Sequence, residues 1–310
     1  MKKIYYIPFV LLSSFLFWAC EDVIYPELPE AEPVVVIDAW LNNKSDTQMI
    51  RVKQTLPYFD VEELPGITGA EVMITDNGGK VYNFIESEIN EGEYYWDPES
   101  MGAVFGDIGR SYTLTVKTGE TVFNSFATMN DVPEIDSVSF RFEEGNSFFP
   151  DAYFASFYAV DLVGPGDTYW IRTYKNGTLL NKPSEINIAY DAGFSAGSLV
   201  DGITFIQPIR DGVNPFDTDD NDEFLPPYSP GDSVYVEIHS ISNEAYIFLN
   251  ELALQTDRPG GFAELFAQPL SNMPSNIINS TTNEKVIGFF NVAAVSSEGR
   301  LLDPDNLPTD

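Results

Sequence analysis

The sequence is poor in the residues on which most catalytic and metal sites depend. Its 310 residues include one cysteine, Cys20, and one histidine, His239. A single cysteine excludes an internal disulfide framework, and a single histidine leaves almost no material for histidine catalysis or a multi-histidine metal site. Basic residues are also scarce, with 16 against 48 acidic side chains. The resulting net charge of −32 repels phosphate backbones and argues against nucleic-acid binding.

Apolar side chains, in contrast, are present in the amount that packed cores require. Hydrophobic residues make up 44% of the chain and aromatic residues 14%, which excludes wholesale disorder. At roughly 100–200 residues per domain, a chain of this length is expected to form two domains.

The start of the chain has the pattern of a secretory leader. Lys2 and Lys3 precede an apolar stretch over residues 4–19, which lacks a stop-transfer flank. The stretch ends in Phe17-Trp18-Ala19-Cys20, which resembles the lipobox where a bacterial lipoprotein is cleaved and its cysteine acylated. We predict a lipoprotein signal peptide over residues 1–19 and a lipid anchor at Cys20. The alternative is an ordinary signal peptide followed by an unrelated cysteine.

The residues after Cys20 indicate where the protein is exported. Glu21 and Asp22 resemble the acidic export signal of Bacteroidota lipoproteins that reach the outer face of the outer membrane. Residues 20–33 are rich in proline and carboxylates, which disfavour helix and sheet. We therefore expect an extended acidic tether and a protein at the cell surface.

From residue 34 the apolar pattern is that of β-strands. Residues 34–41 form a β-branched run that is long enough for a central strand. Asp76-Asn77-Gly78-Gly79 separates two alternating segments and predicts a hairpin, and Thr118-Gly119-Glu120 predicts a second one. We predict an immunoglobulin-like or transthyretin-like β-sandwich over residues 34–130.

Residues 131–310 are expected to form a second antiparallel β-domain, either a sandwich or a barrel. Residues 242–257 depart from the strand pattern, because their apolar residues recur at helical spacing and Ser242 can cap a helix. We predict one amphipathic helix there, with an apolar face of Ala245, Phe248, Leu249 and Leu252. The predicted strands are 135–142, 152–162, 168–174, 185–190, 203–206, 233–239 and 285–295.

An acidic segment is the candidate metal site. Asp217, Asp219 and Asn221 occupy positions 1, 3 and 5 of a calcium loop. The match fails at position 6, where Asp222 replaces glycine, and at position 12, where Tyr228 replaces glutamate. The segment is therefore either a solvated acidic loop or a weak calcium site, and no other cofactor is expected.

No catalytic constellation is evident in the sequence. His239 has no cysteine partner, and no serine has the context of a nucleophile elbow, so we interpret His239 as a structural residue between a strand and the helix. Carboxylate pairs can support glycoside hydrolysis. With 48 acidic residues, however, some pair always lies at a suitable spacing, and we predict a protein that is not an enzyme.

The order of these elements resembles the Bacteroidota outer-membrane lipoproteins of domain-of-unknown-function family 4249. The resemblance is carried by the lipid cysteine, Val35–Leu41, Gly69–Val72 with the Asp76 turn, Gly92–Tyr95, Gly109–Leu114, Val132–Val138, Ser240–Tyr246 and Val286–Phe290. The resemblance implies a lipid-anchored β-protein, often encoded beside TonB-dependent outer-membrane transporters, and supplies no reaction.

We therefore expect a non-enzymatic accessory of TonB-dependent nutrient uptake that acts by binding a ligand or a partner such as the transporter. The alternatives are a structural or adhesive surface module and a carboxylate-dependent hydrolase. Neither the ligand nor the oligomeric state follows from the sequence.

Overall fold

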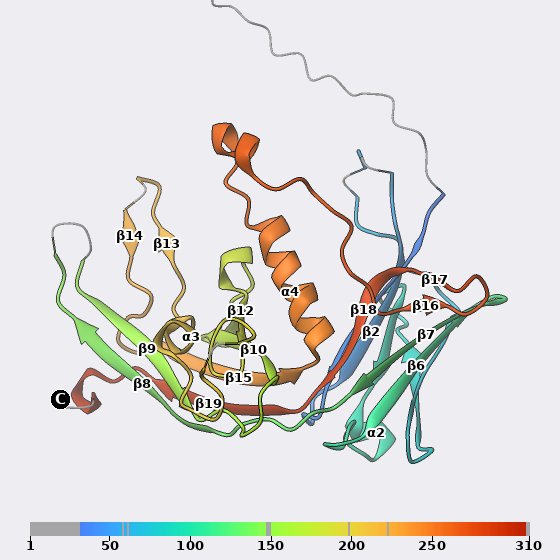
Figure 1. Cartoon of the computed structure of the whole chain (residues 1–310), viewed down its shortest axis with the longest axis horizontal. Helices are drawn as coiled ribbons and strands as arrows, with labels where there is room; N and C mark the ends of the chain where they lie inside the picture. The colour runs from blue at the N-terminus through green and yellow to red at the C-terminus, as the bar shows by residue number, and fades with distance from the viewer. Residues whose placement is uncertain are drawn as a thin grey trace, which may run out of the picture. The chain divides into compact units, whose positions relative to one another are not determined.

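The computed structural model describes residues 32–57, 59–60, 62–146, 150–197, 199–221 and 223–307. Strands predominate among these residues, which confirms the predicted mostly β class (Figure 1). The chain from Pro33 to Asp310 groups into one compact unit. The predicted leader, Cys20 and residues 20–31 of the predicted tether lie outside the described residues.

The first sheet of the described residues contains ten strands. In spatial order they are β17 (Glu284–Lys285), β16 (Ile278–Asn279), β7 (Thr121–Thr128), β6 (Ser111–Thr118), β3 (Glu71–Asp76), β4 (Val81–Glu86), β5 (Glu93–Trp96), β2 (Gln48–Gln54), β1 (Val35–Asn42) and β18 (Ile287–Ala293). A short helix, α2 (Pro98–Met101), follows β5.

Both predicted hairpins belong to this sheet. The turn at Asp76–Gly79 joins β3 to β4, and the Asp76 carboxylate accepts hydrogen bonds from the backbone N–H groups of Gly78 and Lys80, each at 2.8 Å. Gly79 has a φ of +86°, the left-handed conformation that glycine adopts without strain. The second turn joins β6 to β7, whose closing pair is Thr118 and Thr121.

Alternate side chains of these strands form one apolar core. In β1, for example, Ile37, Ala39 and Leu41 are buried, whereas Asp38 and Trp40 point to the opposite face. The sheet folds over this core so that β18 lies against β7. Burial of the core is the main stabilising contribution to this part of the chain.

Two strands from near the two ends of the described chain form a parallel pair. Strand β1 pairs with β18, from Val36 opposite Ile287 to Asn42 opposite Ala293. Gly288 makes this approach possible, because a Cβ atom at Gly288 would lie 1.9 Å from the carbonyl oxygen of Ile37. Its φ of +117° also favours glycine.

The second sheet runs in the order β11 (Thr178–Leu179), β10 (Thr168–Lys175), β15 (Ser233–Ile241) and β19 (Val295–Leu301), with β12 (Asn187–Tyr190) also paired to β10. A hairpin of β8 (Ile135–Glu143) and β9 (Ala152–Ala159) shares its apolar core. Besides one longer helix that follows β15, the other described elements are short: β13 (Asp217–Thr218), β14 (Phe224–Leu225), α3 (Gln207–Asp211), η2 (Pro183–Glu185), η3 (Gly261–Phe266) and η4 (Pro304–Asn306).

Sheet membership does not follow the order of the sequence. Residues 278–293, which we predicted to lie in the second domain, complete the first sheet as β16, β17 and β18. After Ala294 the chain continues directly into β19 of the second sheet. Hydrogen bonding between strands about 250 residues apart in the sequence has no local signal, which is why the pattern does not reveal it.

Two strand predictions differ from the structure. Residues 203–206 do not form a strand, since Thr204 makes only an isolated bridge to Val160 and Ile206 is the N-cap of helix α3. The predicted strand over 285–295 is β18, whereas β19 was not predicted at all. The middle of β19 is polar and exposed, as is typical of an edge strand, so it lacks apolar alternation.

The predicted helix is confirmed as α4 (Asn243–Thr256). Ser242 caps it, because its side-chain oxygen accepts a hydrogen bond from the N–H of Ala245 at 3.1 Å. Ala245 and Leu249 are buried, and Phe248 and Leu252 are partly buried against the same cluster. Figure 1 shows the helix rising from the end of β15 beside β18.

Substitution of Leu249 by alanine is expected to destabilise the protein. Leu249 is 2% exposed, and deletion of a buried leucine side chain typically costs about 2–5 kcal/mol. Leu254→Ala is the matched control on the same helix, because Leu254 is 55% exposed and its loss should change the free energy of unfolding by less than about 0.5 kcal/mol. Urea unfolding measures both values, and equal losses would show that α4 does not pack as described.

Candidate functional site

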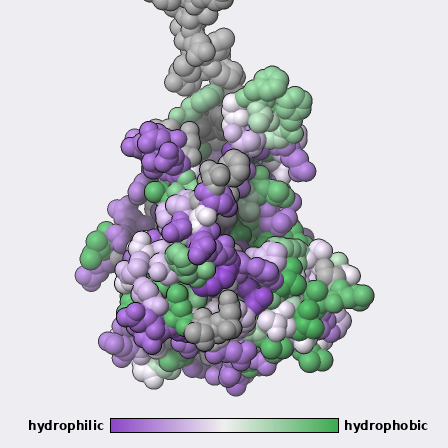
Figure 2. Space-filling view, turned by 90° about the vertical axis from the view of Figure 1, so that its left-hand side faces the viewer, coloured by the Kyte–Doolittle hydropathy of each residue, from purple (hydrophilic) through white to green (hydrophobic). Residues whose placement is uncertain are grey.

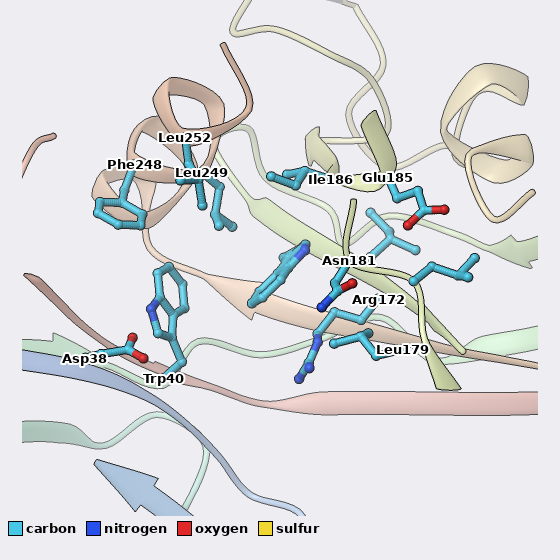
Figure 3. Close-up of a pocket in the computed structure, with 13 residues that line it drawn as sticks. Asp38, Trp40, Arg172, Leu179, Asn181, Glu185, Ile186, Phe248, Leu249 and Leu252 are labelled. Carbon is cyan, nitrogen blue, oxygen red and sulfur yellow. The ribbon is translucent and has the colours of Figure 1, made fainter. Parts of the chain in front are cut away.

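A cavity of about 340 Å³ lies between helix α4, strand β10 and the outer face of β1 (Figure 3). Its volume falls at the lower end of the range of roughly 300–1,000 Å³ that is usual for small-molecule sites. The lining residues are mostly apolar: Trp40, Trp170, Ile171, Leu179, Leu180, Ile186, Phe248, Leu249 and Leu252, with Asp38, Arg172, Asn181 and Glu185 among them.

Strand alternation places the aromatic residues of the cavity. Trp40 lies on the face of β1 opposite to the first core, and Trp170 on the face of β10 opposite to the buried Tyr169 and Ile171. Because β1 and β10 belong to different sheets, the two indoles come from strands that do not pair. Their ring centroids are 5.5 Å apart in an edge-to-face arrangement.

Two phenylalanines pack against Trp40: Phe248, which also lines the cavity, and Phe289, which supports both rings from behind the lining. Phe289 of β18 stacks on Trp40 with ring centroids 5.4 Å apart, and Phe248 of α4 lies 5.7 Å from Trp40 and 4.8 Å from Phe289. Each such pair adds about 0.5–1.5 kcal/mol beyond its burial. The aromatic wall of Trp40, Trp170 and Phe248 therefore has a rigid shape before any ligand arrives.

Arg172 is the cation of the cavity. Its guanidinium carbon lies 4.9 Å from the ring centroid of Trp170 and 5.7 Å from that of Tyr174. The Nε atom of Arg172 is buried and has no hydrogen-bond partner. Figure 3 shows Arg172, Asn181 and Leu179 across the cavity from Phe248, Leu249 and Leu252 of the helix.

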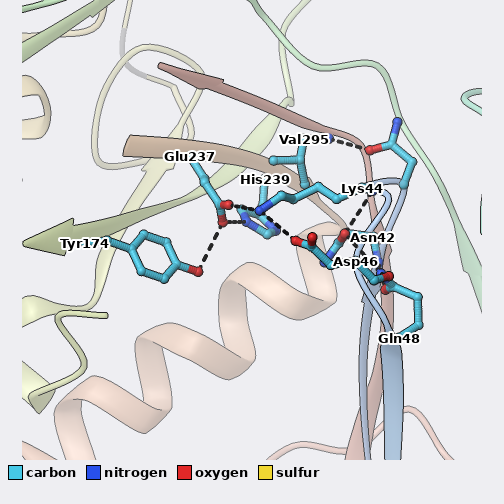
Figure 4. Close-up of polar contacts among 9 residues, drawn as sticks. Asn42, Lys44, Asp46, Gln48, Tyr174, Glu237, His239 and Val295 are labelled. Atoms are coloured by element: carbon cyan, nitrogen blue, oxygen red, sulfur yellow. Dashed lines mark hydrogen bonds and ion pairs between the residues drawn. The ribbon is translucent and has the colours of Figure 1, made fainter. Parts of the chain in front are cut away.

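A buried ion network lies beside the cavity and links the two sheets (Figure 4). Lys44, in the turn between β1 and β2, pairs with Glu237 of β15. The other oxygen of Glu237 bonds Nε2 of His239 at 2.8 Å and accepts a hydrogen bond from the Tyr174 hydroxyl at 3.3 Å. Glu237 is 1% exposed and His239 is 4% exposed, so the buried charge of Glu237 depends on these partners.

The network shifts the protonation equilibria of its members. Burial opposes the charged form of Glu237, but hydrogen bonds from His239 and Lys44 outweigh burial and lower its pKa to about 2. Burial also lowers the pKa of His239, even though its bond to Glu237 acts in the opposite direction. Glu237 is therefore ionised and His239 neutral at pH 7.

The stability that Glu237 contributes is expected to disappear in acid. Its folded pKa lies below the ordinary value of 4.5, so the contribution is present above pH 4.5 and is lost as the pH falls toward 2. The free energy of unfolding of Glu237→Gln should lie on the order of 3 kcal/mol below that of the wild type at pH 7. Urea unfolding between pH 7 and pH 3 should show this difference shrinking.

The exposed Glu298 of β19 supplies the control, because Glu298→Gln removes the same charge from the neighbouring strand. A difference between wild type and Glu237→Gln that stays constant with pH would show that the Glu237 carboxylate does not act through its charge.

Of the predicted calcium ligands, Asp217 lies in β13, and Asp219 and Asn221 lie in the turn between β13 and β14. Asp217 pairs with Lys182. Asp219 accepts hydrogen bonds from the backbone N–H groups of Asn221 at 2.8 Å and Glu223 at 2.9 Å, and Asp222 lies outside the described residues. Within the part of the chain that the structure describes, no group of three or more acidic, histidine or cysteine residues is arranged to hold a metal.

A second hollow, of about 530 Å³, is lined by Tyr190, Asp191, Asp201 and neighbouring loop residues. Asp191 accepts hydrogen bonds from the backbone N–H groups of Gly166 and Asp167. Burial, reinforced by the charges of Asp161 and Asp191, raises the pKa of Asp167 to about 6. The carboxylates of Asp191 and Asp201, which line this hollow, are occupied by backbone donors, so the aromatic cavity is the better candidate site.

Sequence reasoning singled out His239 and the 217–221 segment but missed the aromatic cavity. The available signal was the pair of tryptophans on the outward positions of Val35–Asn42 and Thr168–Lys175, where an exposed strand face would carry polar residues. His239 does not line the cavity, and its polar contact is to Glu237.

Residues 21–299 match the family described as Domain of unknown function (DUF4249), and the chain belongs to this family. The search of curated proteins found no match. Across the described residues, every helix is too short or too polar to span a membrane.

Proposed function

We propose that this protein is a surface-exposed outer-membrane lipoprotein that binds a ligand, without catalysis, as an accessory of TonB-dependent nutrient uptake. One observation carries the proposal: a preformed apolar cavity of about 340 Å³ with an aromatic wall and few polar groups. Cavities of this kind are typical small-molecule sites. The predicted leader and Cys20 support the location, and membership of the family supports the setting.

The composition of the cavity favours binding over chemistry. Its titratable residues are Asp38, Arg172 and Glu185, and none of them is joined to a nucleophile in the way that acyl transfer or hydrolysis requires. The aromatic side chains instead offer apolar area and fixed geometry, which are the properties of a binding site.

Binding can be tested with the neutral probe N-phenyl-1-naphthylamine, whose fluorescence rises in apolar surroundings. The wild type should enhance its fluorescence, and Leu252→Trp should weaken binding about tenfold or more, because a larger side chain on the lining fills the space that the probe needs. Leu254→Trp introduces the same indole at an exposed position of the same helix and should bind like the wild type. Equal binding by all three proteins would contradict the proposal.

The accessory role requires a separate experiment on the full chain in its membrane. A native pull-down from detergent-solubilised outer membranes should recover a TonB-dependent transporter with the wild type. Cys20→Ser should release the protein from the membrane or stall its processing, because it removes the acylation site. Recovery of no transporter would refute the accessory role, and a Cys20→Ser protein that remains an integral outer-membrane lipoprotein would refute the anchor.

A second candidate, a structural or adhesive surface module, is favoured by an exposed apolar turn. Phe262, Leu265 and Phe266 of η3 are each more than 75% exposed, and exposed apolar patches commonly mark interaction sites. Figure 2 shows apolar side chains at the upper end of the molecule, the height at which Figure 1 draws this turn in orange.

For an adhesive module, Phe262→Ser/Phe266→Ser should reduce aggregation of cells that display the protein, because it removes two exposed rings. Stability should change by less than about 1 kcal/mol in total. Leu252→Trp should leave aggregation unchanged. If only Leu252→Trp impairs the cellular function, the adhesive candidate is excluded.

A further inference from the structure

Arg172 and Arg210 are the two described arginines whose buried Nε atoms have no hydrogen-bond partner, and of these two only Arg172 lines the cavity. Acidic side chains outnumber basic ones by 48 to 16. Lys44, Arg51, Arg141, Lys175 and several others pair with a carboxylate. Among the described residues, the guanidinium of Arg172 makes neither a salt bridge nor a hydrogen bond, and its buried Nε atom has no hydrogen-bond partner. A half-buried guanidinium without an acceptor is costly, unless a ligand supplies one.

The nearest candidate partner of Arg172 is already engaged. Glu237 lies directly opposite Arg172 in the pairing of β10 with β15. Its two oxygens, however, bond Lys44 on one side and His239 and Tyr174 on the other. The network thus neutralises the only carboxylate across the strand pair and leaves the charge of Arg172 uncompensated.

The carboxylates at the edge of the cavity also have partners. Asp38 pairs with Arg51 at 3.4 Å, and Glu185 accepts a hydrogen bond from the backbone N–H of Lys182 at 2.8 Å. The charge of Asp38 is thus offset by Arg51, whereas Glu185 keeps its negative charge, and Arg172 is the cation of the cavity that has no ion-pair partner. The net negative charge of the chain acts at longer range and is screened beyond about 8 Å at physiological salt.

The aromatic surroundings hold the guanidinium in place. Arg172 lies over the faces of Trp170 and Tyr174, which restricts its rotamers before a ligand binds. A planar guanidinium that is fixed in this way matches the two oxygens of a carboxylate. The neighbouring wall of Trp40, Trp170 and Phe248 is suited to the apolar part of the same molecule.

We propose that the cavity binds a small apolar carboxylate, whose carboxylate group pairs with Arg172 while its hydrocarbon or aromatic body packs against Trp40, Trp170 and Phe248. This inference rests on the proposed binding function and specifies the ligand class. The cavity volume of about 340 Å³ limits the ligand to a single small molecule.

Three probes with one common body test the inference: 4-phenylbutyrate, 4-phenylbutanol and 4-phenylbutylamine. Their binding to the full chain can be measured by isothermal titration calorimetry at pH 7 and fixed ionic strength. The wild type should bind the carboxylate about tenfold or more tightly than the alcohol, as expected for a charge-assisted hydrogen bond, and should bind the amine most weakly.

Arg172→Gln should abolish the preference for the carboxylate but leave binding of the alcohol within about twofold. Lys175→Gln is the matched control, because Lys175 lies three residues further along the same strand, carries the same charge and does not line the cavity. Arg172→Lys should restore only part of the preference, since it keeps the charge but loses the planar donor pair.

The outcomes separate the two proposals. If the alcohol and the naphthylamine probe bind but the carboxylate is not preferred, the ligand class is wrong and the binding function stands. A preference for the amine, or an equal loss in Arg172→Gln and Lys175→Gln, also overturns the ligand class. If no probe binds, both proposals fail. Should Arg172→Gln not fold, as judged by its thermal melt, the three-probe comparison on the wild type still decides.

Discussion

The parallel pairing of β1 with β18 is the constraint on which the rest of the structure depends. It brings residues 36–42 against residues 287–293 and so joins the two ends of the described chain. The close contact at Gly288 allows no side chain there. Because β18 continues after one residue into β19, the same strand run that completes the first sheet also forms the edge of the second. The two cores are thus linked by continuous backbone.

The ion pair of Lys44 with the buried Glu237, together with the hydrogen bond of Glu237 to His239, strengthens this link. Lys44 belongs to a turn of the first sheet, and Glu237 and His239 belong to a central strand of the second. Buried ion pairs add little net stability over apolar packing, but loss of one partner is costly because the other charge remains buried. The network therefore favours a single arrangement of the β1–β2 turn against β15 and leaves its neighbour Arg172 without a carboxylate.

The cavity is a consequence of the same arrangement. The outward face of β1 and the outward face of β10 would each meet solvent in an isolated sheet, yet here both meet helix α4. The helix covers Trp40 and Trp170 but leaves a cavity beside the two rings, and residues 179–181 and 185–186 line another side of it. Two strand faces and one helix thereby make an apolar site whose cation, Arg172, has no ion-pair partner.

Local patterns in the sequence determined much of the fold. The β-branched run before Asn42, the turn at Asp76–Gly79 and the capped helix after Ser242 each have a local cause, namely side-chain alternation, positive φ and an N-cap hydrogen bond. The family also followed from the order of such elements. The scarcity of cysteine and histidine, visible from the composition, argues against disulfide and histidine chemistry without any coordinates.

Only the tertiary structure decided which faces meet. Alternation shows that Trp40 and Trp170 share no face with their buried neighbours, but it cannot show that they lie 5.5 Å from each other across 130 residues of sequence. Nor can it reveal that Glu237 forms an ion pair with Lys44 and a hydrogen bond with His239, which leaves Arg172 without an ion-pair partner. Periodicity is a property of neighbouring residues, whereas a cavity and an unpaired charge are properties of segments that pack together only after the chain has folded.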